Sequence, residues 1–119
     1  MKLKGEENSR SLQAADYYAK TLIRRELFEE AKALLRKIIP VARRVLGADY
    51  WLTLRIRCTY AEALYNDPAA PLNDLREAVT TLEDTNRIAR RVLGNTHPTT
   101  NEYEEALREA RAALRDRTE

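Results

Sequence analysis

The chain has 119 residues with 21 basic and 19 acidic side chains, and this near balance argues against a nucleic-acid-binding protein, which usually carries a segregated basic excess. Its single cysteine, Cys58, excludes an internal disulfide and a zinc site built from cysteines. No apolar run approaches the length of a membrane span or of a signal peptide, so we expect one cytoplasmic domain that does not enter a membrane.

Five helices are expected along the chain. Charged residues make up 34% of the composition, while Gly occurs only 3 times and Pro 4 times, and this combination favours helices over strands. Residues 1–8 are polar and are expected to be flexible. The spacing of apolar residues then places helices at about 10–24, 27–46, 50–65, 71–93 and 98–116. Because the connecting loops are short, neighbouring helices should pack antiparallel.

The first two predicted helices each carry apolar residues three and four positions apart, which forms one apolar face. In the first helix this face contains Leu12, Ala15, Tyr18, Ala19 and Leu22. In the second helix it contains Phe28, Ala31, Leu35, Ile38, Ala42, Val45 and Leu46. Pro40 lies inside the second helix and predicts a kink near Arg36–Pro40 rather than a break, because the apolar face resumes in phase after it.

The stretch ARRVLG ends both the second and the fourth helix, at Ala42–Gly47 and Ala89–Gly94. At a shift of 47 residues, nine of the 18 positions that end on these glycines are identical. The Val and Leu of each copy continue the apolar face, and each Gly stands where a residue with positive φ would end the helix. Asp49 and Thr96 follow the two glycines and are predicted as N-caps of the third and fifth helices.

The last three helices repeat the same spacing. The third helix carries Leu52, Ile56, Tyr60, Ala63 and Leu64, and the sequence DPAAP ends it. The fourth carries Ala78, Leu82, Thr85, Ile88, Ala89, Val92 and Leu93. The fifth carries Tyr103, Ala106, Leu107, Ala110 and Leu114. Since the fifth helix has a single apolar face and a charged back, we expect it to pack against the fourth near Ile88 and Val92 and to cap the core.

These motifs resemble a known repeat. The segment FEEAKALLRKIIPVARRVLG, followed by LTLRIRCTYAEAL, resembles the tetratricopeptide repeat in its kinesin-light-chain-like form. Phe28–Ala31 matches the Y-x-E-A that opens the second helix of that repeat, and Val45–Gly47 and Val92–Gly94 match the L-G that closes it. His97–Thr100 matches the H-P-x-T that opens the next helix pair. The resemblance covers about residues 11–115.

The resemblance implies an all-α, superhelical fragment of five antiparallel helices within residues 9–116. Repeat one would span about 10–47, repeat two about 48–94, and a C-terminal capping helix about 98–116. The shift of 47 residues is about five longer than the repeat of that family, and the excess falls in NDPAAPLND, within repeat two.

The resemblance also implies a binding surface on the inner face of the superhelix, formed by the first helix of each pair. The residues implied are Gln13, Asp16, Lys20, Arg24, Arg55, Cys58, Glu62, Tyr65, Glu102, Glu105 and Glu109. Their charges are mixed at one end and acidic at the other. A partner should therefore place basic groups near the fifth helix.

The function implied is protein–protein interaction without catalysis: a scaffold that holds a peptide or a partner helix on its inner face. No cofactor, metal or membrane is expected, and the expected state is a monomer, with a homodimer left open. A purely structural or self-associating segment of a longer helical array is an alternative. Nucleic-acid binding through the pairs Arg24–Arg25, Arg43–Arg44 and Arg90–Arg91 is less favoured, because acidic residues are interleaved with them.

Four single residues have competing interpretations. His97 stands at a helix start and is interpreted as a cap or a packed ring rather than a catalytic group. Cys58 is interpreted as a half-buried, unreactive thiol. Tyr50 and Trp51 could form a lid over the junction of the two repeats or a binding anchor, and packing is the favoured interpretation.

Overall fold

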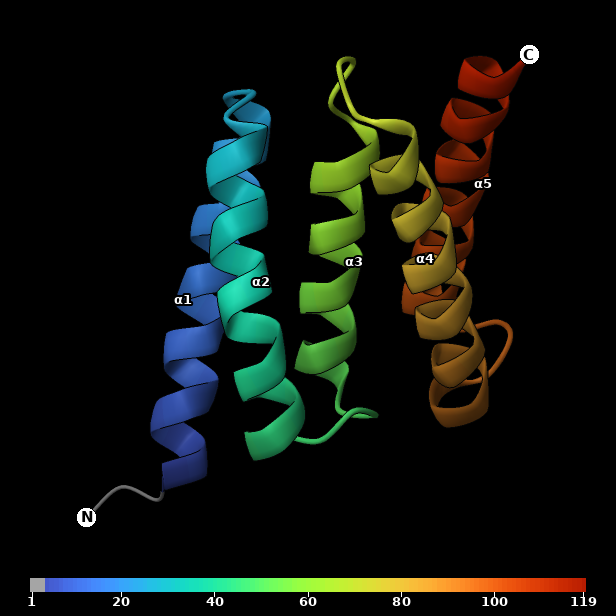
Figure 1. The fold of residues 1–119 in the computed structure, drawn as a ribbon. Coiled ribbons are helices and arrows are strands. Elements are labelled where there is room, and N and C mark those ends of the chain that lie inside the picture. Colours follow the sequence, from blue (N-terminus) through green and yellow to red (C-terminus); the bar gives the residue numbers. More distant parts are fainter. Residues whose placement is uncertain (1–3) are drawn as a thin grey trace.

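The computed structural model describes residues 4–119, and these residues form five helices joined by short loops (Figure 1). The helices are α1 (Lys4–Arg24), α2 (Phe28–Val45), α3 (Trp51–Tyr65), α4 (Leu72–Leu93) and α5 (Pro98–Thr118). The all-α fold is confirmed, and the bounds of α2 to α4 lie within one residue of those predicted. None of these helices is long and apolar enough to cross a membrane.

The first helix begins earlier than predicted. It starts at Lys4 rather than near residue 10, so part of the segment expected to be flexible is helical. The segment before Leu12 contains no proline, and a helix that has formed extends at little cost until a breaker stops it. Residues 1–3, which belong to the segment 1–8, lie outside the described residues.

Helices α1, α3 and α5 form one layer, and α2 and α4 pack against it from the other side. Helix α3 is central, since it contacts all four other helices, while no Cα atom of α2 lies within 8 Å of a Cα atom of α4. The molecule measures about 55 × 32 × 20 Å, and Figure 1 shows the helix pairs side by side with α3 in the middle. This is the arrangement of stacked helix pairs.

The core lies between the two layers, and most residues of the predicted apolar faces are buried in it. Leu35, Ile56, Leu64 and Leu82 have essentially no exposed surface. Twelve of the 15 residues of α3 are buried, because this helix has neighbours on every side.

Three residues of the predicted apolar faces are exposed instead. Tyr18 is 57% exposed because α1 has neighbours only on its α2 and α3 sides. Val45 and Val92 occupy the last turns of α2 and α4, where the packed neighbours give way to loops, and Val92 is 49% exposed. Only the following leucines, Leu46 and Leu93, pack against the core there. The prediction that Val92 would pack under α5 is therefore wrong.

The helix ends confirm the positive φ predicted for the two glycines and correct the two predicted N-caps. Gly47 and Gly94 have φ of 102° and 97°, as predicted, although a ψ of 159° puts Gly94 in an extended conformation rather than the left-handed helical one. Asp49 and Thr96 are not N-caps, because α3 and α5 start one residue later than that role requires. The N-caps are Tyr50 and His97, and the backbone N–H of Thr99 donates to Nδ1 of His97 at 3.1 Å.

Polar side chains join α2, α3 and α4 on the side away from α1 and α5. Lys32 of α2, which is buried, pairs with Asp74 of α4 at 3.0 Å. Tyr60 of α3 accepts a hydrogen bond from Arg36 of α2 at 2.9 Å and donates one to Glu77 of α4 at 2.7 Å. In addition, Arg57 of α3 pairs with Asp84 of α4 at 2.8 Å. Of these bonds, Lys32–Asp74 and Arg36–Tyr60 connect the two helix pairs.

Candidate functional site

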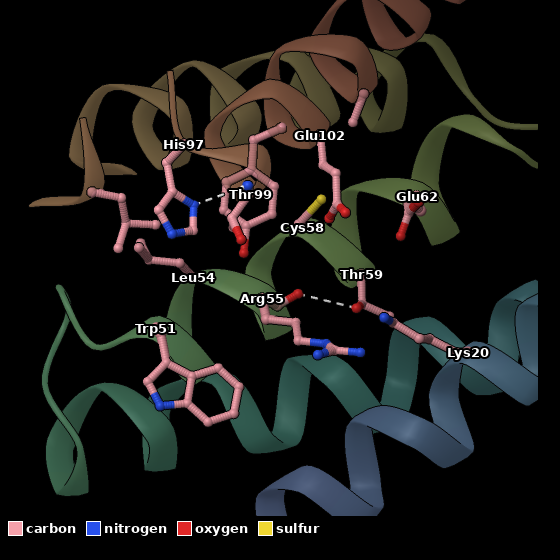
Figure 2. A pocket seen from close by; sticks show the side chains of 13 residues that line it. Lys20, Trp51, Leu54, Arg55, Cys58, Thr59, Glu62, His97, Thr99 and Glu102 are labelled. Atoms are coloured by element: carbon pink, nitrogen blue, oxygen red, sulfur yellow. Dashed lines mark hydrogen bonds between the residues drawn. The ribbon is translucent and has the colours of Figure 1, made fainter. Parts of the chain in front are cut away.

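A groove of about 660 Å³ runs across α1, α3 and the start of α5 (Figure 2). Most of its lining comes from α3, where residues at helical spacing share one face. From α3 come Trp51, Leu54, Arg55, Cys58, Thr59 and Glu62. Lys20 of α1 lies on one side, and on the other lie Leu93, His97, Thr99, Glu102, Tyr103 and Ala106. The side chains that line the groove are thus positioned by helices rather than by a mobile loop.

The structure brings five of the predicted inner-face residues together in this groove: Lys20, Arg55, Cys58, Glu62 and Glu102. Two more, Gln13 and Asp16, line an adjoining hollow of about 220 Å³ that shares Trp51 and Arg55 with the groove. The Tyr65 hydroxyl donates a hydrogen bond to Glu109 at 2.8 Å, which joins α3 to α5.

Four predicted residues line neither the groove nor the adjoining hollow: Arg24, Tyr65, Glu105 and Glu109. Arg24 donates to the hydroxyl of Thr21 on the exposed surface of α1. Glu105 pairs with Arg108 along α5. On α5, the side chains that line the groove include Thr99, Glu102 and Ala106. Around the helix axis, Thr99 and Ala106 lie on one side of Glu102, while Glu105 lies about 60° away on the other side.

Seven groove residues were not predicted as part of the binding surface: Leu54, Thr59, Leu93, His97, Thr99, Tyr103 and Ala106. A signal for three of them was present, because Thr59 lies four positions after Arg55, and Thr99 and Ala106 lie three before and four after Glu102. Residues so spaced share a helix face. Tyr103 had been assigned to the core, and it is buried while also lining the groove.

The two carboxylates of the groove, Glu62 and Glu102, form no close ion pair among the described side chains, although Lys20 acts on Glu62 at longer range. Among residues 8–119, no Lys or Arg nitrogen lies within 4.0 Å of a carboxylate oxygen of Glu62 or Glu102. Burial raises the pKa of Glu62, and the carboxylates of Asp16, Glu109 and Glu102 raise it further, while Lys20 opposes them. A charged Glu62 is therefore held at a cost in free energy.

The basic side of the groove consists of Lys20 and Arg55, which Figure 2 shows close to each other. Asp16 is 2% exposed, and its Oδ2 lies 3.5 Å from Nε of Arg55. Its Oδ1 has no hydrogen-bond partner among the described residues. Burial raises the pKa of Asp16, and Lys20 and Arg55 work in the opposite direction.

Trp51 and Cys58 differ in how far they are available to a partner. Trp51 is 41% exposed, its ring centroid lies 5.9 Å from that of Tyr50, and it lines both hollows. Cys58 is only 9% exposed, less than the half-burial expected, and burial strongly raises the pKa of its thiol. A thiol that stays protonated is a weak nucleophile. Among residues 8–119, no three His, Cys, Asp or Glu side chains are grouped to hold a metal ion.

Stacked antiparallel helix pairs with a groove across the first helix of each pair define a helical-repeat protein. The tetratricopeptide repeat family matches residues 12–49, which cover most of α1, all of α2 and the turn after it. Residues 12–49 are thus similar to a tetratricopeptide repeat, and the described residues as a whole form an all-α fold of stacked helix pairs, consistent with that similarity. The kinesin-light-chain-like form of the repeat stays a prediction. Comparison with curated proteins and with solved structures gave no match.

Tetratricopeptide repeats generally mediate protein–protein interaction or scaffolding, and they are typically not catalytic.

Proposed function

We propose that this protein is a non-catalytic interaction module that holds a segment of a partner protein in the groove between α1, α3 and α5. The observation that carries this proposal is an exposed tryptophan, Trp51, in a groove of about 660 Å³ whose two carboxylates, Glu62 and Glu102, form no ion pair within 4.0 Å among residues 8–119. Tryptophan is enriched among the residues that contribute most to protein interfaces.

The energetics support a site prepared for a ligand. Glu62 and Asp16 are kept partly or wholly buried, although burial disfavours their charge. A partner that supplies donors or cations to these carboxylates would recover that cost on binding. The lining residues stand on helices whose opposite sides are packed in the core, so little order is lost when a partner binds.

A photo-crosslinking experiment tests this proposal. A benzophenone-bearing residue replaces Thr99 in the groove, and in a control protein it replaces Lys37, which is exposed on α2 outside the groove. After irradiation in lysate, mass spectrometry identifies the crosslinked proteins. We expect partners that crosslink from position 99 but not from position 37.

Charge substitutions form the second part of the crosslinking experiment. Glu102→Lys should remove those partners from the captured set, because Glu102 lines the groove, whereas Glu105→Lys should leave them in place. An identical captured set for wild type and Glu102→Lys, or equal crosslinking from positions 99 and 37, would show that the groove is not the binding surface.

A further inference from the structure

The charges that line the groove are separated into two groups, and this separation bears on what the groove accepts. Lys20 and Arg55 lie toward α1, while Glu62 and Glu102 lie toward α5 (Figure 2). We infer that the partner segment carries a lysine or arginine whose cationic group binds between Glu62 and Glu102, and an acidic side chain that faces Lys20 and Arg55. This inference rests on the proposed function and adds the chemistry of the partner.

Glu62, which is partly buried, and Glu102, which is exposed, differ from two partly buried carboxylates elsewhere, Asp74 and Asp84. Asp74 and Asp84, on the opposite side of the molecule, each have a cationic nitrogen at 3.0 Å or less. Glu62 and Glu102 have none within 4.0 Å among residues 8–119. Because Glu62 is partly buried and its charge is disfavoured there, a cation supplied from outside can stabilise it through a charge-assisted hydrogen bond, with Glu102 as a second acceptor.

The surroundings of Glu62 and Glu102 favour a positively charged group on the partner. Glu109 lies on the same side and is held by the neutral hydroxyl of Tyr65, so it adds negative charge without a cation. The floor between them is formed by Cys58 and Tyr103, which are uncharged and buried. A lysine or arginine side chain can rest its apolar stem on such a floor while its charged end reaches the carboxylates.

The side of the groove next to α1 favours a negatively charged group on the partner. Asp16 approaches only Nε of Arg55, and no described side chain accepts a hydrogen bond from the two terminal nitrogens of that guanidinium. A guanidinium with free terminal nitrogens binds a carboxylate through two parallel hydrogen bonds. Lys20 adds a second positive charge beside it. A purely basic segment would be repelled here, and a purely acidic one would be repelled at Glu62 and Glu102.

Trp51 allows a direct test, because it is the only tryptophan and it lines the groove. Short tryptophan-free synthetic peptides are titrated against the full chain, with Trp51 fluorescence and calorimetry as independent readouts. One set combines a lysine and a glutamate separated by varied numbers of neutral residues, a second set contains only lysines, and a third only glutamates. We expect binding by members of the mixed set, weakened by added salt.

Charge variants of the protein test where the cationic side chain of the peptide binds. Glu102→Gln should weaken binding of the mixed peptide about tenfold, whereas Glu105→Gln, on the same helix but outside the groove, should leave the Kd unchanged. Both positions are exposed, so neither change should disturb folding. In a charge exchange, Glu102→Lys should bind the all-glutamate peptides better than the wild type does.

Three results would overturn the inference: equal affinity for the three peptide sets, no heat and no fluorescence change with any peptide, or equal weakening by Glu102→Gln and Glu105→Gln. If partners still crosslink at position 99 while the peptides fail in one of these ways, the chemistry assigned to the partner is wrong and the proposed function stands. If crosslinking at position 99 also fails, the proposed function is wrong as well.

Discussion

At the scale of single residues, the turn between α1 and α2 contains Glu26, whose φ of 62° is left-handed. The backbone N–H of Leu27 donates to the carbonyl of Leu22 at 2.8 Å and that of Glu26 to the carbonyl of Ile23 at 2.9 Å, which is the Schellman pattern of a helix end. Glycine usually occupies this position, because a side chain there is strained.

We therefore expect Glu26→Gly to raise the free energy of unfolding by about 0.5–1 kcal/mol, the relief of strain exceeding the greater entropy of glycine in the unfolded chain. Urea denaturation followed by circular dichroism measures the change. Glu30→Gly, in the exposed part of α2, is the control and should lower stability by about 1 kcal/mol. A loss of stability in both variants would contradict a strained Glu26.

The pKa of Glu62 predicts a pH-dependent effect. Because burial raises this pKa, the folded protein holds the proton of Glu62 more tightly than the unfolded chain does. The contribution of Glu62 to stability is thus most favourable below the ordinary value of 4.5 and is lost as the pH rises through the raised pKa. Glu62→Gln should raise the melting temperature at neutral pH, and this gain should disappear near pH 4.

Thermal unfolding of Glu62→Gln and wild type across that pH range checks the sign, with Glu105→Gln as an exposed control that should show neither effect. A gain at neutral pH together with weaker peptide binding would show that stability is given up for function at this position. A variant less stable than the wild type at neutral pH would mean that the charge of Glu62 is satisfied within the fold.

At the scale of helices, the buried ion pair between Lys32 and Asp74 joins α2 directly to α4. Burial opposes the charge of Lys32, but the carboxylates of Glu29 and Asp74 outweigh it, so the pKa of Lys32 is raised. Asp74→Asn should lower the free energy of unfolding by about 1–3 kcal/mol, because it leaves a buried ammonium group with only the exposed Glu29.

The matched control is Asp49→Asn. Asp49 and Arg91 form an ion pair with the same sequence separation of 42 residues, but both side chains are more than half exposed. An exposed pair contributes about 0–1 kcal/mol, so this variant should remain close to wild type in urea denaturation. Equal losses for the two variants would mean that burial does not set the strength of these links.

Local patterns in the sequence predict the helices well and their contacts less well. The positive φ of Gly47 and Gly94 and, to within one residue, the four helix bounds at α2 and α3 follow from short stretches of sequence, because turns are local, whereas the predicted N-caps were each one residue too early. The exposure of Val45 depends on whether a neighbouring helix extends as far as the last turn of α2. The local sequence pattern carries no information on where the neighbouring helices end.

The same limit applies to the site. Helical spacing and the family resemblance identified Lys20, Arg55 and Glu62 as inner-face residues, and all three line the groove. Glu105 was also assigned to that face, and only the orientation of α5 against α3 shows that it turns away. The bond between Lys32 of α2 and Asp74 of α4 joins residues 42 positions apart and was not predicted, because it depends on how the helix pairs stack.

At the scale of the whole molecule, α5 packs over the second helix pair and supplies part of the groove. Tyr103, Ala106, Leu107 and Ala110 are buried, and α5 packs against both α3 and α4. Near its C-terminal end, Arg117 donates hydrogen bonds to the backbone carbonyls of Ala70 and of Pro68, the latter at 3.1 Å, in the loop between α3 and α4. Helix α5 therefore covers the core and also fixes the long loop of the second helix pair.

A chain that ends at Leu93 should consequently lose stability and aggregate. Its α4 would expose Ile88 and Ala89, which are buried in the full chain, and burial of a side chain such as Leu107 contributes about 1.5–3 kcal/mol. Two or three such losses approach the whole stability of a small domain, which is about 5–15 kcal/mol. Thermal unfolding and light scattering of the two chains measure the effect, and an unchanged melting temperature in a soluble truncated chain would contradict the capping role of α5. Because α5 also supplies Glu102 and Thr99 to the groove, the element that protects the core is also part of the proposed binding site.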